Sequence, residues 1–216
     1  LFDKVSLEIP EMANPLVPGT WRSTSIATVS YGHGISVTPL HLASSVAAAS
    51  GSGTMVEPTL MHRGGAPAPM GERLFSEETT KAVRSMMRLV VSHPDGTGNF
   101  AEAKGYMVGG KTGTSEKINP DGGYFKDKNI ASFAATFPVH DPRYVLVVIV
   151  DEPKGQKHSY GYATGGWVAA PAAKRIIEHT APLLGILPVD ENSPEIRQKL
   201  RLDFKIGKEE KTLASY

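Results

Sequence analysis

The residues most able to do chemistry in this chain form the tetrapeptide Lys111-Thr112-Gly113-Thr114. Threonine hydroxyls can donate hydrogen bonds to a carboxylate, and a lysine beside them adds positive charge and can assist proton transfer. Glycine lets a ligand approach the backbone closely, and a free backbone N–H beyond it can donate into an oxyanion hole. These residue types indicate a strand that binds a carboxylate and stabilises an oxyanion. The alternative is an exposed polar strand with a glycine bulge.

The same lysine also completes a phosphate-binding pattern. The stretch from Gly105 to Thr112 reads Gly-Tyr-Met-Val-Gly-Gly-Lys-Thr, which satisfies the P-loop pattern G-x-x-x-x-G-K-[ST]. A P-loop needs an apolar strand before its first glycine and a helix that opens at the lysine. Residues 99–104 are polar, and the glycines and proline of 113–123 do not favour a helix. A P-loop nucleotide hydrolase is therefore kept only as an alternative.

The elements that must position this tetrapeptide can be predicted from turns, caps and periodicity. The expected strands are 107–116, 130–137 and 144–151. Because short turns join them, these strands should be antiparallel. The expected helices are 39–50 after the N-cap Thr38, 77–92 after the N-cap Ser76, 166–184, and a weak one over 194–202. The order predicts the α/β class, of α+β type, with helices packed on an antiparallel sheet.

Less structure is expected elsewhere. Residues 1–37 are rich in proline and glycine and favour loop, residues 56–60 favour a short strand, and residues 64–71 favour a loop of small residues. Tyr160, Tyr162 and Trp167 could line a ligand groove or pack at the junction of sheet and helix. Asp151 and Glu152 could form a carboxylate pair, although the end of a strand is usually solvated.

Composition excludes several function classes. The 216 residues carry a formal net charge of +1, so no nucleic-acid partner is expected. The absence of cysteine excludes disulfides and thiolate catalysis, and the seven histidines form no metal-binding pair such as H-E-x-x-H. Neither a metal nor a cofactor is expected. The longest strongly apolar run, 145–150, is far shorter than the roughly 20 residues that span a bilayer.

Four blocks of this sequence resemble the class B penicillin-binding proteins, the transpeptidases of division and elongation. The blocks are 105–114 with Lys-Thr-Gly-Thr, 32–43 with Val-Thr-Pro-Leu-His-Leu-Ala, 130–138 and 165–171. In this family, K-T-G accompanies S-x-x-K and S-x-N motifs. The resemblance covers roughly residues 1–185 and is most specific to the septal type. It implies the C-terminal part of a β-lactamase/transpeptidase-like domain, an incomplete domain followed by a charged extension over 186–216.

The resemblance also implies roles for the tetrapeptide. Lys111 would lie near the nucleophile and shape its electrostatics, and the backbone N–H of Thr114 would supply half of the oxyanion hole. Thr112 and Thr114 would bind the substrate carboxylate, and Gly113 would give clearance. The parent protein would be a serine D,D-transpeptidase on the periplasmic side of the bacterial inner membrane, with its anchor upstream. It would cross-link peptidoglycan stem peptides and react with β-lactam antibiotics. Cell-division proteins are its candidate partners.

The chain departs from the family pattern in one respect. It contains no S-x-x-K, no S-x-N and no G-x-S-x-G motif, so the nucleophilic serine is expected upstream of Leu1. The fragment alone should not form an acyl-enzyme. An unpaired edge of the sheet is expected, covered by the missing N-terminal half of the domain or by a second copy. A non-catalytic fragment or interaction module is the remaining alternative.

Overall fold

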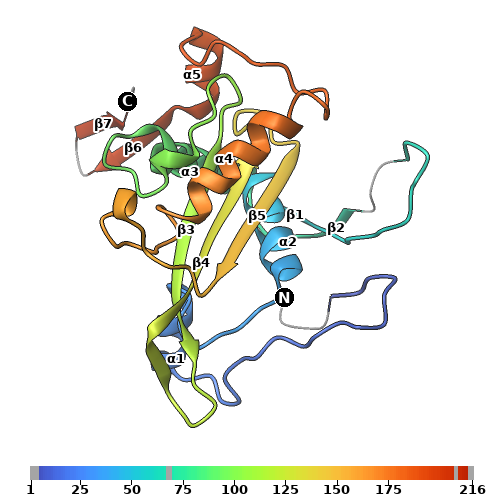
Figure 1. Cartoon of the computed structure of the whole chain (residues 1–216). Coiled ribbons are helices and arrows are strands. Elements are labelled where there is room, and N and C mark those ends of the chain that lie inside the picture. Colours follow the sequence, from blue (N-terminus) through green and yellow to red (C-terminus); the bar gives the residue numbers. More distant parts are fainter. Residues whose placement is uncertain (1–4, 67–69, 207–208, 214–216) are drawn as a thin grey trace.

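A three-stranded antiparallel sheet forms the centre of the protein (Figure 1). The structure is a computed structural model that describes residues 5–66, 70–206 and 209–213. The strands are β3 (Gly109–Ile118), β4 (Tyr124–Phe137) and β5 (Tyr144–Asp151), in the order β3-β4-β5. The predicted antiparallel arrangement is confirmed: Lys111 pairs with Ala134, and Phe133 pairs with Val148.

β4 begins six residues earlier than the predicted strand over 130–137. The predicted turn does form, because Asn119 N–H donates to the carbonyl of Gly123 at 3.0 Å. Gly122 and Gly123 have φ values of 107° and 72°, a region that suits glycine. The turn therefore lets β3 and β4 remain paired almost to its ends, as a long hairpin that projects below the sheet in Figure 1.

Helices cover both faces of the sheet. Helix α4 (Ala169–Thr180) crosses one face in front of β4 and β5, while α2 (Pro39–Ser50) lies behind them and α3 (Glu77–Ser92) contacts β3 (Figure 1). The predicted caps of the last two are confirmed, because the side chains of Thr38 and Ser76 accept from backbone N–H groups of the first turn. The predicted α/β class, with helices on an antiparallel sheet, is therefore correct.

The main core lies between β4 and α4. Alternate β4 residues Phe133, Ala135 and Phe137 point to the same side, because side chains alternate along a strand. They meet small residues of α4, chiefly alanines, whose short side chains allow the helix to approach the sheet closely. Phe133 is fully buried and Phe137 is 3% exposed. This packing fixes the position of β4, and through the β3–β4 ladder it fixes β3.

The N-terminal region contains short elements that the sequence did not indicate. Helix α1 (Ser23–Ser30) lies within the predicted loop 1–37; it has no side-chain cap and no buried residue, so neither signal marks it. Strand β1 (Thr54–Val56) shares only Val56 with the predicted strand 56–60, and residues 57–60 are not a strand. β1 pairs with β2 (Met70–Arg73), whose first two residues were expected as loop. Residues 67–69 of that predicted loop lie outside the described residues.

The segment after the sheet departs from prediction in the length of its first helix and in an unpredicted hairpin at its end. Helix α4 is shorter than the predicted 166–184, because Pro182 follows its last turn and Gly185 takes a φ of 72°. Helix α5 (Pro194–Leu200) agrees with the predicted weak helix and is capped by the Ser193 side chain. A hairpin of β6 (Leu202–Ile206) and β7 (Glu209–Leu213) follows.

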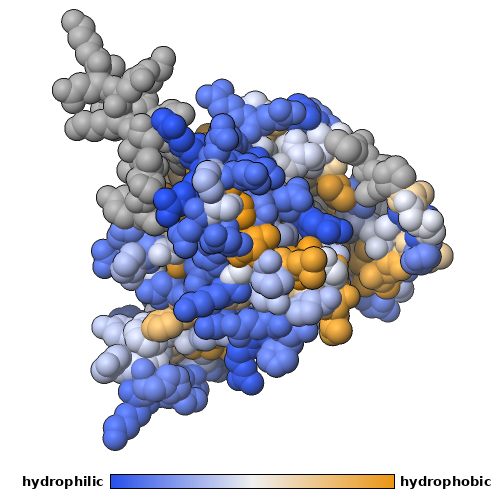
Figure 2. Space-filling model, turned by 90° about the horizontal axis from the view of Figure 1, so that it is seen from above, coloured by the Kyte–Doolittle hydropathy of each residue, from blue (hydrophilic) through white to orange (hydrophobic). Residues whose placement is uncertain are grey.

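The surface seen from above is mostly hydrophilic, with apolar side chains gathered in a few central patches (Figure 2).

Among the described residues, the outer edges of β3 and β5 have no strand partner. No described helix is both long enough and apolar enough to cross a membrane. The edge of β3 is the one that carries Lys111 to Thr114, so the tetrapeptide lies on an open side of the sheet.

Candidate active site

The tetrapeptide Lys111 to Thr114 lies on the edge strand β3, and its side chains alternate between the two faces of the sheet. Thr112 and Thr114 share the face covered by α4, since they pair with Phe133 and Ala131. The lysine side chain is exposed, and its Nζ donates to the carbonyl of Thr112 at 2.7 Å. The P-loop alternative is wrong, because Lys111 continues a strand and no helix opens there.

Thr114 is oriented by Gly165, which lies just before α4. The backbone N–H of Gly165 donates to Thr114 Oγ1 at 3.0 Å. A hydroxyl has one proton and two lone pairs, so this bond occupies a lone pair and leaves the proton available. Thr114 is therefore set to donate to an anionic ligand.

Thr112 is tied to the loop that follows α3. Its hydroxyl donates to Thr97 Oγ1 at 3.0 Å. The same loop lies against the start of α4, because a Cβ added to Gly166 would come within 3.0 Å of the Thr97 carbonyl oxygen. Three hydroxyls, those of Thr97, Thr112 and Thr114, thus belong to one small region of the surface. Prediction from sequence missed Thr97, because it lies between two glycines and outside the predicted helices and strands.

Glycine is required at two places around this region. A Cβ on Gly113 would come within 3.0 Å of the Ser132 hydroxyl on β4, and a Cβ on Gly165 would come within 3.0 Å of two carbonyl oxygens, those of Ser132 and Gly113. The start of α4 therefore lies directly on the sheet beneath the threonines. Gly113 thus gives clearance toward β4, and its predicted clearance toward a ligand stays a prediction.

An aromatic cluster adjoins this region. The ring of Trp167 lies 4.8 Å from Phe100, 6.0 Å from Tyr160 and 6.2 Å from Tyr162, measured between ring centroids. Tyr160 is 81% exposed and Tyr162 is 57% exposed. Trp167 thus packs among rings, as one of the two sequence interpretations holds, while the tyrosines leave apolar surface open beside the threonines.

The two carboxylates at the end of β5 have a structural partner. Lys117 Nζ lies 2.8 Å from Asp151 and 2.9 Å from Glu152. The hydrogen bonds that Lys117 donates to Asp151 and Glu152 raise the pKa of Lys117, and the bond to Glu152 lowers the pKa of that carboxyl. These groups neutralise one another at the surface and do not form an acid–base pair. Among the residues described, no group of three or more His, Asp or Glu could hold a metal ion.

A large cavity lies elsewhere. A cavity of about 1020 Å³ lies between α3, the loop before β3 and the segment 189–201, and it is not lined by Lys111 to Thr114. The tetrapeptide instead faces open solvent along the unpaired edge of β3. An edge of this kind can form one wall of a cleft only when another part of a protein supplies the second wall.

Comparison with known proteins agrees with this arrangement. The penicillin-binding protein transpeptidase domain matches residues 3–178. The probable peptidoglycan D,D-transpeptidase FtsI of Caulobacter vibrioides is 42% identical over 192 residues, which is 86% of this chain and 33% of that protein. The Escherichia coli K12 peptidoglycan D,D-transpeptidase FtsI is 38% identical over 168 residues, 78% of this chain and 27% of that protein.

Solved structures show the same fold. The apo transpeptidase domain of Burkholderia pseudomallei penicillin-binding protein 3 superposes with a TM-score of 0.77 at 36% identity, over 90% of this chain and 56% of that one. Mycobacterium tuberculosis penicillin-binding protein 3 in complex with ampicillin gives a TM-score of 0.76 at 27% identity, over 91% of this chain and 46% of that one. The chain spans about a third or less of the length of these curated relatives. With its sheet, its Lys-Thr-Gly-Thr edge strand and this match, the chain belongs to the penicillin-binding protein transpeptidase family.

Proposed function

We propose that this chain forms one wall of the active site of a serine D,D-transpeptidase that cross-links peptidoglycan stem peptides. The observation that carries this proposal is the placement of Lys111 to Thr114 on an unpaired sheet edge, with the Thr114 hydroxyl oriented by Gly165. The relatives named as peptidoglycan D,D-transpeptidases support the reaction. The nucleophile belongs to the longer parent protein, because the chain contains no S-x-x-K motif.

The chemistry follows from the groups present. The Thr114 hydroxyl, whose proton is free, donates to the terminal D-Ala carboxylate, and Lys111 adds positive charge beside it. Thr112 adds a second hydrogen bond when its proton turns from Thr97 to the carboxylate. The serine of the parent protein attacks the carbonyl of the D-Ala–D-Ala amide, and the Thr114 backbone N–H donates to the oxygen of the tetrahedral intermediate. Terminal D-Ala then leaves with a proton. The amine of a second stem peptide attacks the acyl ester, restores the serine hydroxyl and forms the cross-link.

The same groups account for penicillin binding. A β-lactam carries a carboxylate and a strained amide, so it can occupy the position of the D-Ala–D-Ala terminus. Acylation opens the ring, and the fragment that would depart as D-Ala stays attached. The ampicillin complex of the Mycobacterium tuberculosis relative supports this ligand class.

The location and partners of the parent protein form part of the proposal. Because peptidoglycan lies outside the inner membrane, the domain works on the periplasmic side, with its anchor in the N-terminal part of the parent protein. The similarity to the two FtsI proteins favours a role in division, with cell-division proteins as partners. In the parent protein, the missing N-terminal half of the domain covers the free edge of β5. In the isolated fragment, a second copy of this chain could cover the same edge.

A fluorescent penicillin tests the proposed function. Parent protein carrying an upstream S-x-x-K serine should be labelled covalently, and Lys111→Met should abolish labelling while leaving the thermal unfolding temperature nearly unchanged, because this side chain is exposed. The 216-residue chain alone should not be labelled. As a control, replacing the upstream serine should abolish labelling, which shows that the penicillin reacts with that serine. An unlabelled parent protein would support the alternative of a non-catalytic fragment or interaction module, and labelling of the isolated chain would place the nucleophile here.

A further inference from the structure

The backbone that leads into β3 holds one residue, Met107, in a conformation that a residue with a Cβ does not favour. Gly105 has a φ of 83° and Met107 has a φ of 48°, so a left-handed glycine is followed two residues later by a left-handed methionine. A residue with a Cβ takes this conformation only where its surroundings determine it. Because Met107 lies just before Gly109, the first residue of β3, the groups that hold this bend also set where the strand begins.

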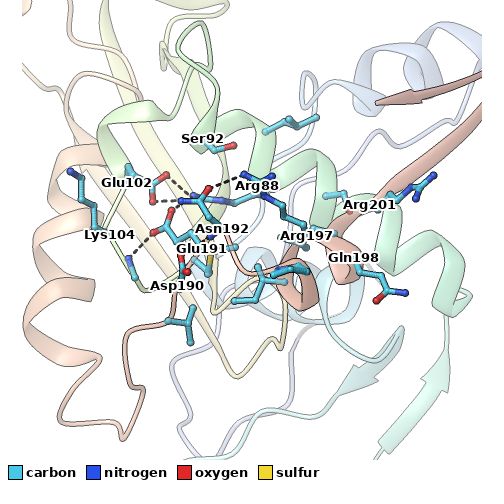
Figure 3. A pocket seen from close by; sticks show the side chains of 18 residues that line it. Arg88, Ser92, Glu102, Lys104, Asp190, Glu191, Asn192, Arg197, Gln198 and Arg201 are labelled. Carbon is cyan, nitrogen blue, oxygen red and sulfur yellow. Dashed lines mark hydrogen bonds and ion pairs between the residues drawn. The ribbon is translucent and has the colours of Figure 1, made fainter. Parts of the chain in front are cut away.

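Two groups hold the bend from the side of the sheet and of α3. Val139 N–H donates to the Met107 carbonyl at 2.7 Å. The guanidinium of Arg88, from α3, donates to the Val108 carbonyl at 2.8 Å. Arg88 is only 9% exposed, so its position matters more than that of a surface arginine. It points into the cavity below α3, as Figure 3 shows.

Two carboxylates fix the direction of the Arg88 guanidinium. Glu102 lies 2.8 Å from Nη1 and Glu191 lies 3.0 Å from Nη2 (Figure 3). Planar guanidinium donors are directional, so two carboxylates on different nitrogens leave little freedom to rotate. Glu102 precedes the bend, whereas Glu191 comes from the segment between α4 and α5. A distant part of the chain therefore orients the group that binds Val108.

The segment that contains Glu191 also binds the bend directly. The second oxygen of Glu191 accepts from Gly105 N–H at 2.6 Å, and Val189 N–H donates to the Gly105 carbonyl at 2.9 Å. Pro188 lies so close that a Cβ on Gly105 would come within 3.0 Å of its ring. One carboxylate thus joins α3, the bend and the segment 188–191. This segment lies beyond residues 3–178, where the family match ends.

We propose that Glu191 is a positioning residue for the proposed transpeptidase: by holding Arg88 and Gly105 it sets the placement of the Lys111–Thr114 strand. The inference rests on the proposed function. Gly109 and Lys111 belong to one continuous strand, so a shift at Gly109 is carried to Lys111 two residues later. Reacting groups displaced by about 1 Å can lose on the order of a hundredfold in rate. Glu191 touches neither substrate nor nucleophile, and it acts through the strand.

The test measures penicillin acylation in the parent protein, with active sites counted by titration. Glu191→Ala removes both contacts, and Glu191→Gln keeps an acceptor for Gly105 N–H but removes the charge that orients Arg88. Glu195→Gln is the matched control, because Glu195 is an exposed carboxylate on α5. The second-order acylation rate constant per titrated site should fall about tenfold or more in Glu191→Ala. A smaller fall is expected in Glu191→Gln, and none in the control.

A purely structural role gives a different result. In that case Glu191→Ala lowers the unfolding temperature or the number of titratable sites, while the rate constant for each surviving site equals that of the wild type, and the inference is overturned. If Glu191→Ala does not fold, Glu191→Gln decides by the same criterion. Failure of the proposed function is separate, because wild-type parent protein would then not be labelled at all.

Discussion

The backbone N–H of Gly165 lies 3.0 Å from the hydroxyl oxygen of Thr114, although 51 residues separate them in the chain. This bond connects the start of α4 with the edge strand β3. It gives Thr114 a fixed lone-pair partner and leaves its proton free for a ligand. The helix that packs on the core therefore also sets the orientation of the proposed carboxylate-binding hydroxyl.

Gly165→Ala should disturb this contact. The added Cβ would come within 3.0 Å of the carbonyl oxygens of Ser132 and Gly113, so the start of α4 must move away from the sheet. We expect a loss of about 1 to 3 kcal/mol in the free energy of unfolding, as overpacking usually causes. Slower penicillin acylation of the parent protein should accompany it. Gly19→Ala is the control, since no atom lies within 4 Å of a Cβ there. Equal effects of the two substitutions would refute the close packing.

Thr114→Val should weaken carboxylate binding more than Thr112→Val does. The proton of Thr114 is free, whereas that of Thr112 is engaged by Thr97. A hydrogen bond to a charged group contributes about 1.5 to 3 kcal/mol. Acylation by penicillin should therefore slow by about 10- to 100-fold in Thr114→Val. Thr114→Ser, which keeps the hydroxyl, should restore most of the rate.

A ligand that lacks the carboxylate tests whether the slower acylation of Thr114→Val is caused by weaker carboxylate binding. The rate measurement should be repeated with a β-lactam whose carboxylate is esterified. With that compound, Thr114→Val and the wild type should differ little, since no anion is present for the hydroxyl to bind. An undiminished difference with the ester would show that Thr114 acts on another part of the ligand.

Trp167 should contribute more to stability than its exposed neighbour Tyr160. Trp167 is in contact with three aromatic rings, and each such pair is worth about 0.5 to 1.5 kcal/mol beyond area burial. We expect Trp167→Ala to lower the free energy of unfolding by about 2 kcal/mol or more, and Tyr160→Ala by about 0.5 kcal/mol or less. Denaturant titration of the two variants checks this. Slower acylation in Tyr160→Ala without loss of stability would favour the groove interpretation for the tyrosines.

Local signals explain how much of the fold could be predicted. The caps at Thr38 and Ser76 and the turn after Asn119 each depend on neighbouring residues. The two capped helices agree with prediction and the turn forms, although β4 begins six residues earlier than predicted. Helix α1 has neither a capping side chain nor a buried face, so nothing in its sequence marks it.

The same reasoning applies to the site. The tetrapeptide Lys111 to Thr114 is contiguous, so its residue types are readable together. The groups that orient it are not contiguous: Thr97 is 15 residues from Thr112, and Glu191 is 103 residues from Arg88. Nothing in a single sequence pairs residues over such separations. Glu191 lies in the charged extension predicted over 186–216, and only the fold shows it bound to a mostly buried arginine.

His140 should make stability depend on pH. Its side chain lies in the turn between β4 and β5, and its Nδ1 is buried with no hydrogen-bond partner among the described residues. Burial lowers the pKa of His140 below its ordinary value of 6.5, and the charge of Lys199 lowers it further, against a smaller opposite effect of Asp141. Protonation of His140 would bury a positive charge at a nitrogen that has no hydrogen-bond acceptor in the described part of the chain, so it is unfavourable in the folded state.

The direction of the effect follows from that lowered pKa. Above about pH 6.5 the histidine is neutral in both states, and its contribution to stability is complete. As the pH falls below 6.5, the unfolded chain takes up a proton that the folded chain refuses, so stability declines until the lower folded pKa is passed. The measurement is the thermal unfolding temperature of the domain between pH 7.5 and pH 5. His140→Gln should make its decline with falling pH less steep. Replacement of the exposed His158 by Gln is the control and should leave the decline as steep as in the wild type. A His140→Gln profile as steep as that of the wild type would assign the acid sensitivity to other groups.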